Sequence, residues 1–426
     1  MKRYWLSLIF VLALAVSPLT LRGADGGLKP GGLKPGDHLA VVGDSITEQR
    51  LYSVFMEDYL LMCQPQLKLR ITQFGWGGET APGFAGRMDN DMLRFQPTAV
   101  STCFGMNDGG YSPMTADKAQ RYREGQTTIV RRAKRGGVRL IVVGSPGCVD
   151  ADTFHNDPAQ AAMYNKTLLA ERDIAREVAQ AEGVSFADVI DPMLEVMAKA
   201  KARYGRQYPL AGGDGVHPGP NGHLVMAYAL LKGLGCDGDI GRITVDLAEG
   251  KAEGSEGHEV LSSSGGVVEV QSSRYPFCFQ GDPASPNSTR GVIRFFPFNQ
   301  DLNRLLLVVR GGQAARYQVT WGKSTKTFTA AGLAAGVNLA AEFLDNPFSG
   351  PFEKVEAKIR QQQDYETPLV KSLIHSLPDY KRMLPDEEST LDRLAAEGIR
   401  RDKTLFDAAA AAVVPVRHQI RIQPVQ

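Results

Sequence analysis

The chain has 426 residues, of which 43% are hydrophobic and 22% are charged, so it is long enough to bury a full core and to form more than one domain. This composition excludes a disordered or fibrous protein. Its 48 basic and 47 acidic residues give a formal net charge of +1, which favours neither nucleic acid nor another polyanion as a partner.

The first 24 residues have the pattern of a secretory signal. Two basic residues precede an apolar run over 5–16, and the small residues Gly23 and Ala24 follow after a proline. The apolar run is too short to span a bilayer comfortably, which argues against a membrane anchor. We therefore expect residues 1–24 to be removed from an exported protein, periplasmic or secreted, that keeps no integral membrane segment.

Residues 25–36 contain a tandem Gly-Gly-Leu-Lys-Pro repeat, at 26–30 and 31–35. Glycine and proline offer little side-chain surface for packing, and such a composition is typical of linkers. We predict a tether between the signal segment and the first domain.

From residue 37 to residue 238, short apolar runs alternate with longer stretches of helical periodicity. The runs cover residues 39–42, 69–74, 98–104, 138–143 and 184–189. Each run is continuous, as expected for a strand that is buried on both faces, and strands that alternate with helices indicate a parallel sheet. The sequence thus predicts an α/β domain in which helices wrap a parallel sheet.

After this domain the pattern changes to short runs of β character. They cover residues 267–270, 292–296, 305–309, 317–321 and 325–328. In the fourth run Tyr317, Val319 and Trp321 alternate with polar residues, which is the period of a half-buried strand. We predict a small antiparallel β domain, like a sandwich, over residues 239–345.

The remaining residues, 346–426, have a mainly helical pattern. The charged stretches 354–363 and 391–403 and an alanine run ending at Ala412 belong to it. The last segment, 413–425, has the pattern of a strand that can return to the β domain. We therefore expect a helical C-terminal region with a terminal strand.

Nothing in the sequence points to a cofactor or a metal. Its five cysteines lack Cys-x-x-Cys spacing, which indicates neither a metal knuckle nor a dense disulfide framework. The chain also lacks a His-Glu-x-x-His motif, a Walker loop and an EF-hand loop. We expect no cofactor and no bound metal.

The first block with chemical potential is Gly43-Asp44-Ser45. It follows the predicted strand 39–42 and precedes a helical pattern over 48–61, so Ser45 is expected at the carboxyl end of a strand, where ligands bind in open α/β sheets. A second interpretation is that Ser45 or Thr47 only caps the helix. Taken alone, this block favours the cap.

Glycine-rich turns follow the next two predicted strands. The segment Gly75-Trp76-Gly77-Gly78 can turn tightly and present an unshielded N–H, which is what a developing oxyanion requires. In Gly105-Met106-Asn107-Asp108 the amide of Asn107 can donate to the same charge, and loss of one such donor typically costs about 3 kcal/mol. Both segments are also ordinary turn sequences.

The fourth block is Asp214-Gly215-Val216-His217, in a loop rich in glycine and proline. A serine becomes a nucleophile when a histidine takes its proton, and a carboxylate fixes the tautomer of that histidine. The three-residue offset lets Asp214 approach one ring nitrogen of His217 while the other faces the crevice. A lone loop histidine is otherwise a surface residue, and His223 fits the start of the following helix.

In this order, the four blocks resemble the SGNH or GDSL hydrolase superfamily, which is named for a Ser, Gly, Asn and His set carried in four blocks. The resemblance covers about residues 37 to 235. It implies a flavodoxin-like three-layer α/β/α fold for the first domain. The β domain and the helical tail are outside it.

The resemblance also implies roles for single residues. Ser45 is then the nucleophile, His217 the base and Asp214 the orienting acid. The oxyanion hole consists of the backbone N–H groups of Ser45 and Gly78 and the amide of Asn107. Gly78 is chosen among three glycines by its place before Glu79-Thr80. Trp76 is unusual in this block, and both a substrate-facing ring and a ring that covers the core remain open.

The implied function is that of an exported, metal-independent serine esterase that acts through an acyl-serine intermediate. Its partner is an acylated small molecule or polysaccharide, and export together with an added β domain favours O-acetyl groups on carbohydrate, by analogy only. Two alternatives are a lipid esterase or lysophospholipase, and a non-catalytic carbohydrate-binding protein. The sequence does not determine the oligomeric state.

Overall fold

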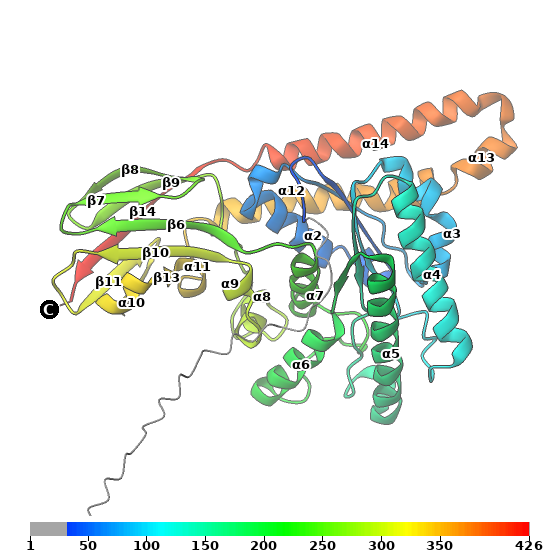
Figure 1. The fold of residues 1–426 in the computed structure, drawn as a ribbon, viewed down its shortest axis with the longest axis horizontal. Coiled ribbons are helices and arrows are strands. Elements are labelled where there is room, and N and C mark those ends of the chain that lie inside the picture. The colour runs from blue at the N-terminus through cyan, green and yellow to red at the C-terminus, as the bar shows by residue number, and fades with distance from the viewer. Residues whose placement is uncertain (1–31, 426) are drawn as a thin grey trace, which may run out of the picture.

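The structure is a computed structural model that describes residues 32–425 (Figure 1). The expected signal peptide and residues 25–31 of the expected tether lie outside the described residues. Within the described part, none of the helices combines the length and the apolar character needed to cross a bilayer. The second copy of the repeat is not a free tether, because Leu33 packs against the core and the N–H of Gly36 donates to the carbonyl of Leu67 at 2.8 Å.

A five-stranded sheet forms the centre of the first half of the chain. Its strands lie in the order β2-β1-β3-β4-β5, and all neighbouring pairs are parallel. The strands are β1 (His38–Gly43), β2 (Arg70–Gln73), β3 (Ala99–Cys103), β4 (Leu140–Gly144) and β5 (Ser185–Ala187). This is the strand order of flavodoxin-like folds, so the predicted fold class is confirmed.

Helices cover both faces of this sheet. They are α1 (Ser45–Glu48), α2 (Tyr52–Asp58), α3 (Ala81–Asp91), α4 (Ala116–Arg135), α5 (Pro158–Glu182), α6 (Ile190–Tyr204) and α7 (Pro220–Gly233). In β1, Leu39 and Val41 belong to a core shared with α2, α6 and α7, whereas Ala40 and Val42 belong to a second core shared with α3 and α4. Alternate residues of β1 thus face two different cores. The sheet therefore lies between two layers of helices, which makes three layers.

The helix expected over 48–61 is interrupted. The chain leaves helical geometry between α1 and α2, where Arg50 has a φ of 56°, and α2 continues into a π-helical turn at Tyr59–Cys63. His223 fills the break: its Nδ1 accepts the N–H of Tyr52 at 3.2 Å and its Nε2 lies 3.0 Å from Gln49 Oε1. His223 is fully buried, and burial lowers its pKa to about 3. Its role in the described structure is to satisfy this break.

The second half of the chain forms two further sheets. One has the order β13-β10-β6-β7 and the other β12-β11-β14-β9-β8. The strands are β6 (Asp239–Asp246), β7 (Lys251–Gly254), β8 (His258–Ser264), β9 (Val267–Ser272), β10 (Arg304–Arg310), β11 (Arg316–Trp321), β12 (Ser324–Thr329), β13 (Val337–Asn338) and β14 (Val416–Pro424). All pairs are antiparallel except β6 with β10, which is parallel.

The inner faces of these two sheets share one apolar core. Val319 and Ile420 from one sheet and Ile243 and Leu307 from the other are completely buried in it. The terminal strand expected over 413–425 is β14, and it lies in the middle of its sheet between β9 and β11. The sheet is therefore incomplete without the last residues of the chain.

One predicted strand is wrong. Residues 292–296 lie in helix α8 (Thr289–Val292) and in a 3-10 turn at Ile293–Phe295. The Ser288 hydroxyl accepts the N–H of Gly291 at 2.8 Å, so a helix cap precedes the apolar run. A short apolar run does not distinguish a strand from a buried helical turn, and the cap decides between them here. The other short helices in this region are α9 (Phe298–Asp301), α10 (Ala330–Ala335) and α11 (Leu339–Glu342).

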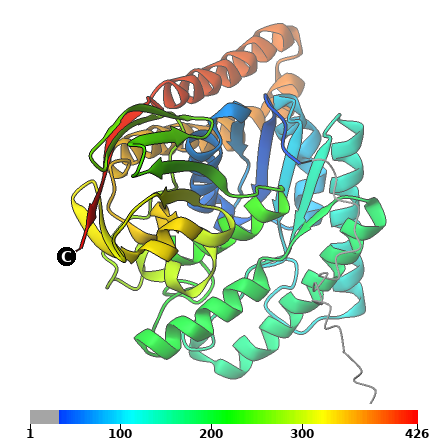
Figure 2. The same ribbon diagram turned by 60° about the vertical axis from the view of Figure 1, so that its left-hand side comes forward.

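The C-terminal helices return to the first sheet. They are α12 (Ser349–Pro368), a π-helical turn at Leu369–Ile374, α13 (Leu377–Met383) and α14 (Glu388–Ala410). On α12, Gln362 Nε2 donates to the carbonyl of Ile71 at 3.1 Å, and Glu366 Oε2 accepts the N–H of Gln73 at 2.8 Å. These bonds satisfy backbone groups of the edge strand β2. From there α14 runs along one side of the molecule and leads back to β14 (Figures 1 and 2).

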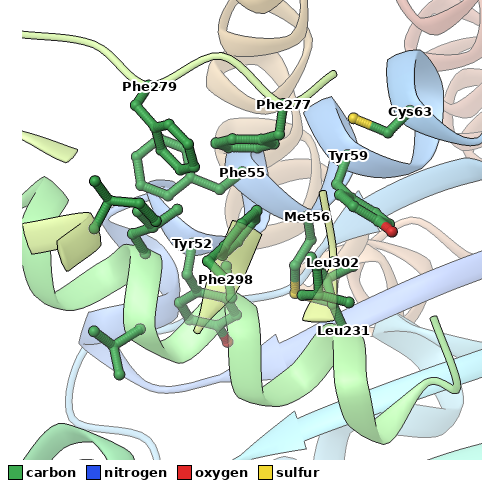
Figure 3. Packing of buried hydrophobic residues seen from close by; sticks show 14 of the residues in the cluster. Tyr52, Phe55, Met56, Tyr59, Cys63, Leu231, Phe277, Phe279, Phe298 and Leu302 are labelled. Atoms are coloured by element: carbon green, nitrogen blue, oxygen red, sulfur yellow. The ribbon is translucent and has the colours of Figure 1, made fainter. Parts of the chain in front are cut away.

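A shared core joins the β region to the first domain. Figure 3 shows side chains of α2, α7 and the segment 277–302 pointing toward one another. Phe277 lies edge-on to Phe55 of α2, with ring centroids 6.4 Å apart, and 5.0 Å from Phe298. This packing holds the β region against α2, which follows β1, and against α7, which precedes β6.

The five cysteines are free thiols, and four of them are buried. Cys103 and Cys148 are 5% and 1% exposed. Across residues 32–425, no group of three or more His, Cys, Asp and Glu side chains is arranged to hold a metal ion.

Candidate active site

Ser45 lies at the first turn of α1, directly after β1. The carboxylate of Asp44 caps this helix by accepting the N–H of Ile46 at 2.9 Å. The cap is therefore Asp44 and not Ser45, which leaves the serine hydroxyl free for another partner. Ser45 Oγ lies 2.8 Å from His217 Nε2, a contact between residues 172 positions apart.

His217 is oriented by the loop in which it lies. Its Nδ1 is 2.7 Å from Asp214 Oδ2, while Asp214 Oδ1 accepts the N–H groups of Val216 and His217, each at 2.9 Å. Burial opposes the ionisation of Asp214, but the N–H and ring of His217 and the N–H of Val216 outweigh it and hold its pKa below the usual value. An ionised Asp214 fixes a proton on Nδ1 and leaves Nε2 free to accept one from Ser45.

The glycine turn after β2 packs directly on α1. A Cβ at Gly75 would lie 2.3 Å from the backbone N of Glu48, so only glycine permits this approach. The N–H of Gly77 donates to Glu48 Oε2 at 2.5 Å, and Gly78 has a φ of +76°. The structure thus places the turn that contains Gly78 against the helix that begins with Ser45.

Asn107 joins the turn after β3 to the turn after β2. Its Nδ2 donates to the carbonyl of Glu79 at 3.0 Å, and Asp108 Oδ1 accepts the N–H of Ala81 at 2.9 Å. An asparagine amide carries two N–H groups, so one remains for a ligand. The structure brings together the two turns that the sequence analysis proposed as oxyanion donors.

Two buried carboxyls accompany these turns. Burial raises the pKa of Asp44 to about 7, against the opposing effects of the Ile46 N–H and His217. Burial also raises the pKa of Asp108 to about 7, and the nearby Asp44 adds to the shift. The fold therefore shifts both groups toward the neutral form relative to an exposed carboxyl.

Sequence reasoning missed Tyr111. This half-buried residue has a φ of 52°, and its hydroxyl is 3.5 Å from Asn107 Oδ1. Burial raises the pKa of Tyr111, and the charges of Asp44 and Asp214 add to the rise, which places the ring among the site groups. It directly follows the block Gly105–Gly110, but no residue pattern indicates that a tyrosine will adopt a left-handed backbone.

Side chains from two distant segments of the chain surround Trp76. The ring is half-buried and lies between cations, with Arg87 4.8 Å and Lys371 4.7 Å from its centroid. The His375 ring is 4.7 Å away. Lys371 and His375 belong to the C-terminal region, far from the blocks in sequence, so no spacing could have predicted this contact.

Comparison with known proteins agrees with this geometry. Residues 41–225 match the GDSL-like Lipase/Acylhydrolase family. An acetylxylan esterase of Geobacillus stearothermophilus is 23% identical over 223 residues, which are 47% of this chain and 94% of the relative.

The whole architecture also recurs in a solved structure. A gut microbial diltiazem-metabolizing enzyme superposes with a TM-score of 0.71 at 23% identity, over 93% of this chain and 99% of that chain. The likeness therefore includes the β sheets and the C-terminal helices as well as the first domain. The whole-length likeness shows the fold, while residues 41–225 resemble the GDSL-like acylhydrolase family; together with the parallel sheet and the contact between Ser45 and His217, this match identifies the chain as an ester hydrolase.

Proposed function

We propose that this chain is an exported serine esterase that removes O-acetyl groups from carbohydrate through an acyl-serine intermediate. One observation carries the proposal: two successive hydrogen bonds, from Ser45 Oγ to His217 Nε2 at 2.8 Å and from His217 Nδ1 to Asp214 Oδ2 at 2.7 Å. A helix cap or a surface histidine would not require this alignment.

The first half-reaction transfers the acyl group to Ser45. Its oxygen attacks the ester carbonyl carbon while His217 Nε2 takes the hydroxyl proton, and the carbonyl oxygen becomes an oxyanion. The N–H groups of Ser45 and Gly78 and the amide of Asn107 are the donors for that charge. The tetrahedral intermediate collapses when the bond to the alcohol oxygen breaks, and His217 gives the proton to the departing alcohol.

The second half-reaction releases the acyl group. Water attacks the acyl-serine carbonyl, His217 again takes the proton, and collapse of the second tetrahedral intermediate returns it to Ser45. The products of this step are the free carboxylic acid and the regenerated enzyme. Asp214 stabilises the protonated imidazole in both halves because it stays ionised next to Nδ1.

Two observations support an acetyl group and a carbohydrate alcohol in the substrate. The acetylxylan esterase named above aligns with this chain over 94% of its own length. The β sheets add surface next to that domain, through the core around Phe55 and Phe277. Export rests on residues 1–24 alone and is tested by amino-terminal sequencing of the mature protein after expression in a secreting host.

The test is acetate release from acetylated xylan and other acetylated polysaccharides, with Ser45→Ala as the matched control. We expect release by the wild type and only background release by the variant. A chain-length series of p-nitrophenyl esters accompanies it, and a preference for octanoate over acetate would replace the carbohydrate substrate with a lipid. Binding of glycans without hydrolysis of any ester would make the chain a binding protein.

A further inference from the structure

Two aromatic residues near the catalytic groups have a left-handed backbone. Tyr111 has a φ of 52° and His155 a φ of 50°. Residues other than glycine adopt this left-handed backbone region at a cost in free energy, and residues in such conformations concentrate at functional sites. Tyr111 is half-buried and His155 is exposed, so part of each ring remains accessible.

Buried rings support both of these side chains. Tyr111 stacks on Tyr164 with centroids 5.0 Å apart, and His155 stacks on Phe154 at 4.1 Å. Phe154 and Tyr164 are fully buried and nearly parallel, with an interplanar angle of 9°. Tyr111 and His155 are themselves 6.3 Å apart. We call these two outer rings the aromatic shelf.

The shelf adjoins both halves of the catalytic machinery. On one side, the Tyr111 hydroxyl lies 3.5 Å from Asn107 Oδ1. On the other, the segment that carries Phe154 packs on the loop of His217: the N–H of Asp150 donates to the carbonyl of Gly215 at 3.0 Å, and a Cβ at Gly215 would lie 2.5 Å from the N of Phe154. The segments that carry the two shelf rings therefore adjoin Asn107 and the loop of His217.

We propose that Tyr111 and His155 form the subsite for the sugar ring that carries the acyl group; this inference rests on the proposed function. An acetyl group has only two carbons and is held by the contacts around the oxyanion donors. The shelf therefore serves the alcohol part of the ester. A pyranose presents a face of C–H groups that packs on an aromatic ring, and the buried second row keeps the two rings in place for it.

The experiment compares two acetate esters that share the acyl group. One is an acetylated xylotriose, whose alcohol part can reach the shelf, and the other is ethyl acetate, whose alcohol part cannot. In Tyr111→Gly and His155→Ala, we expect the ratio of kcat/KM for xylotriose acetate to that for ethyl acetate to fall about tenfold, mainly through KM. Tyr111→Phe keeps the ring and should keep most of the ratio. Glycine adopts a positive φ without strain, so Tyr111→Gly adds no backbone strain, and thermal unfolding of the variant checks that the fold is kept.

Tyr380 provides the matched control, because it is 42% exposed on α13, a helix that packs on α14. We expect Tyr380→Ala to have the wild-type ratio. An unchanged ratio in both shelf variants would overturn the inference. So would a loss confined to p-nitrophenyl octanoate relative to acetate, since the shelf would then hold the acyl chain.

Direct binding separates this inference from the proposed function. Xylotriose is titrated into the full chain carrying Ser45→Ala, with and without Tyr111→Gly, and we expect the second substitution to weaken binding about tenfold. If the wild type hydrolyses ethyl acetate but no carbohydrate acetate, the proposed substrate is wrong. Absence of xylotriose binding to Ser45→Ala would overturn the shelf as well.

Discussion

Lys371 Nζ lies 2.5 Å from Glu48 Oε1, and the other oxygen of that carboxylate accepts the N–H of Gly77 at 2.5 Å. A side chain from the C-terminal region thus reaches the turn of Gly78 through a single residue of α1. Both partners of the ion pair are mostly shielded from solvent, with 28% and 24% of the side chains exposed. The contact gives the C-terminal helices a part in shaping the turn that contains Gly78.

Removal of this contact should slow catalysis. In Lys371→Met, Glu48 loses its charge partner, so the carboxylate that accepts the N–H of Gly77 is held less firmly. We expect kcat for p-nitrophenyl acetate to fall roughly tenfold, less than the 10²- to 10³-fold loss that follows removal of a whole donor. Lys371→Arg keeps the charge and should recover part of the rate.

Lys381 is the matched control for this variant. It pairs with Asp392 at 2.7 Å within the same C-terminal region and does not contact the turn. Lys381→Met should leave kcat as in the wild type. Equal losses in the two methionine variants would mean that the C-terminal region acts through overall stability and not through Glu48.

The proposed nucleophile and base should act as a unit. Ser45→Ala should reduce ester hydrolysis to near background, because the hydroxyl that lies 2.8 Å from His217 Nε2 is lost. Adding His217→Ala should then lower the residual rate little further. Steady-state rates of the two single variants and the double variant give the answer, and strict additivity of the two losses would count against the assignment.

The first domain could be predicted because its signals are local. The continuous runs at 39–42 and 98–104 appear as β1 and β3, and the blocks Gly43–Ser45 and Asp214–His217 each contain their own turn chemistry. Parallel strands all end at one edge of the sheet, so residues that follow them meet there. A single chain therefore sufficed to place Ser45 near His217.

Contacts made by distant segments could not be predicted in the same way. Lys371 and His375 reach Trp76 only because a π-helical turn at Leu369–Ile374 follows Pro368, and no pattern in the sequence specifies that partner. The positive φ of Tyr111 arises from the packing of its ring, which sequence periodicity does not encode. The helix at 289–292 was missed because a cap outweighed an apolar run.

Asn107 should contribute to turnover more than to substrate binding. Its amide is expected to donate to the oxyanion, which exists only in the transition state and the tetrahedral intermediate. We expect Asn107→Ala to lower kcat by 10²- to 10³-fold, about 3 kcal/mol, with a small change in KM. The variant also loses the bond to the Glu79 carbonyl, so its thermal unfolding is measured in parallel. A rise in KM at constant kcat would assign the amide to ground-state binding.

The contribution of Asp108 to the stability of the fold should decrease as pH rises toward neutrality. Burial raises the pKa of Asp108 from 3.8 to about 7, so between these values the folded protein keeps a proton that the unfolded chain has released. Unfolding then releases a proton, and a higher pH favours the unfolded state, by at most about 1.4 kcal/mol per pH unit for one group. Above about pH 7 this group adds no further slope, and Asp44 contributes in the same direction.

Asp108→Asn tests the sign of this effect. The amide stays neutral, and its oxygen can still accept the N–H of Ala81, so the free energy of unfolding from urea titrations should vary less with pH between 5 and 7 than in the wild type. Asp392→Asn is the control, since a hydrogen bond from Lys381 lowers the pKa of Asp392 and keeps its titration below this range. If the free energy of unfolding of Asp108→Asn varies with pH as in the wild type, Asp108 is already ionised in the folded protein at pH 5. The inference of a neutral carboxyl beside Asn107 would then be wrong.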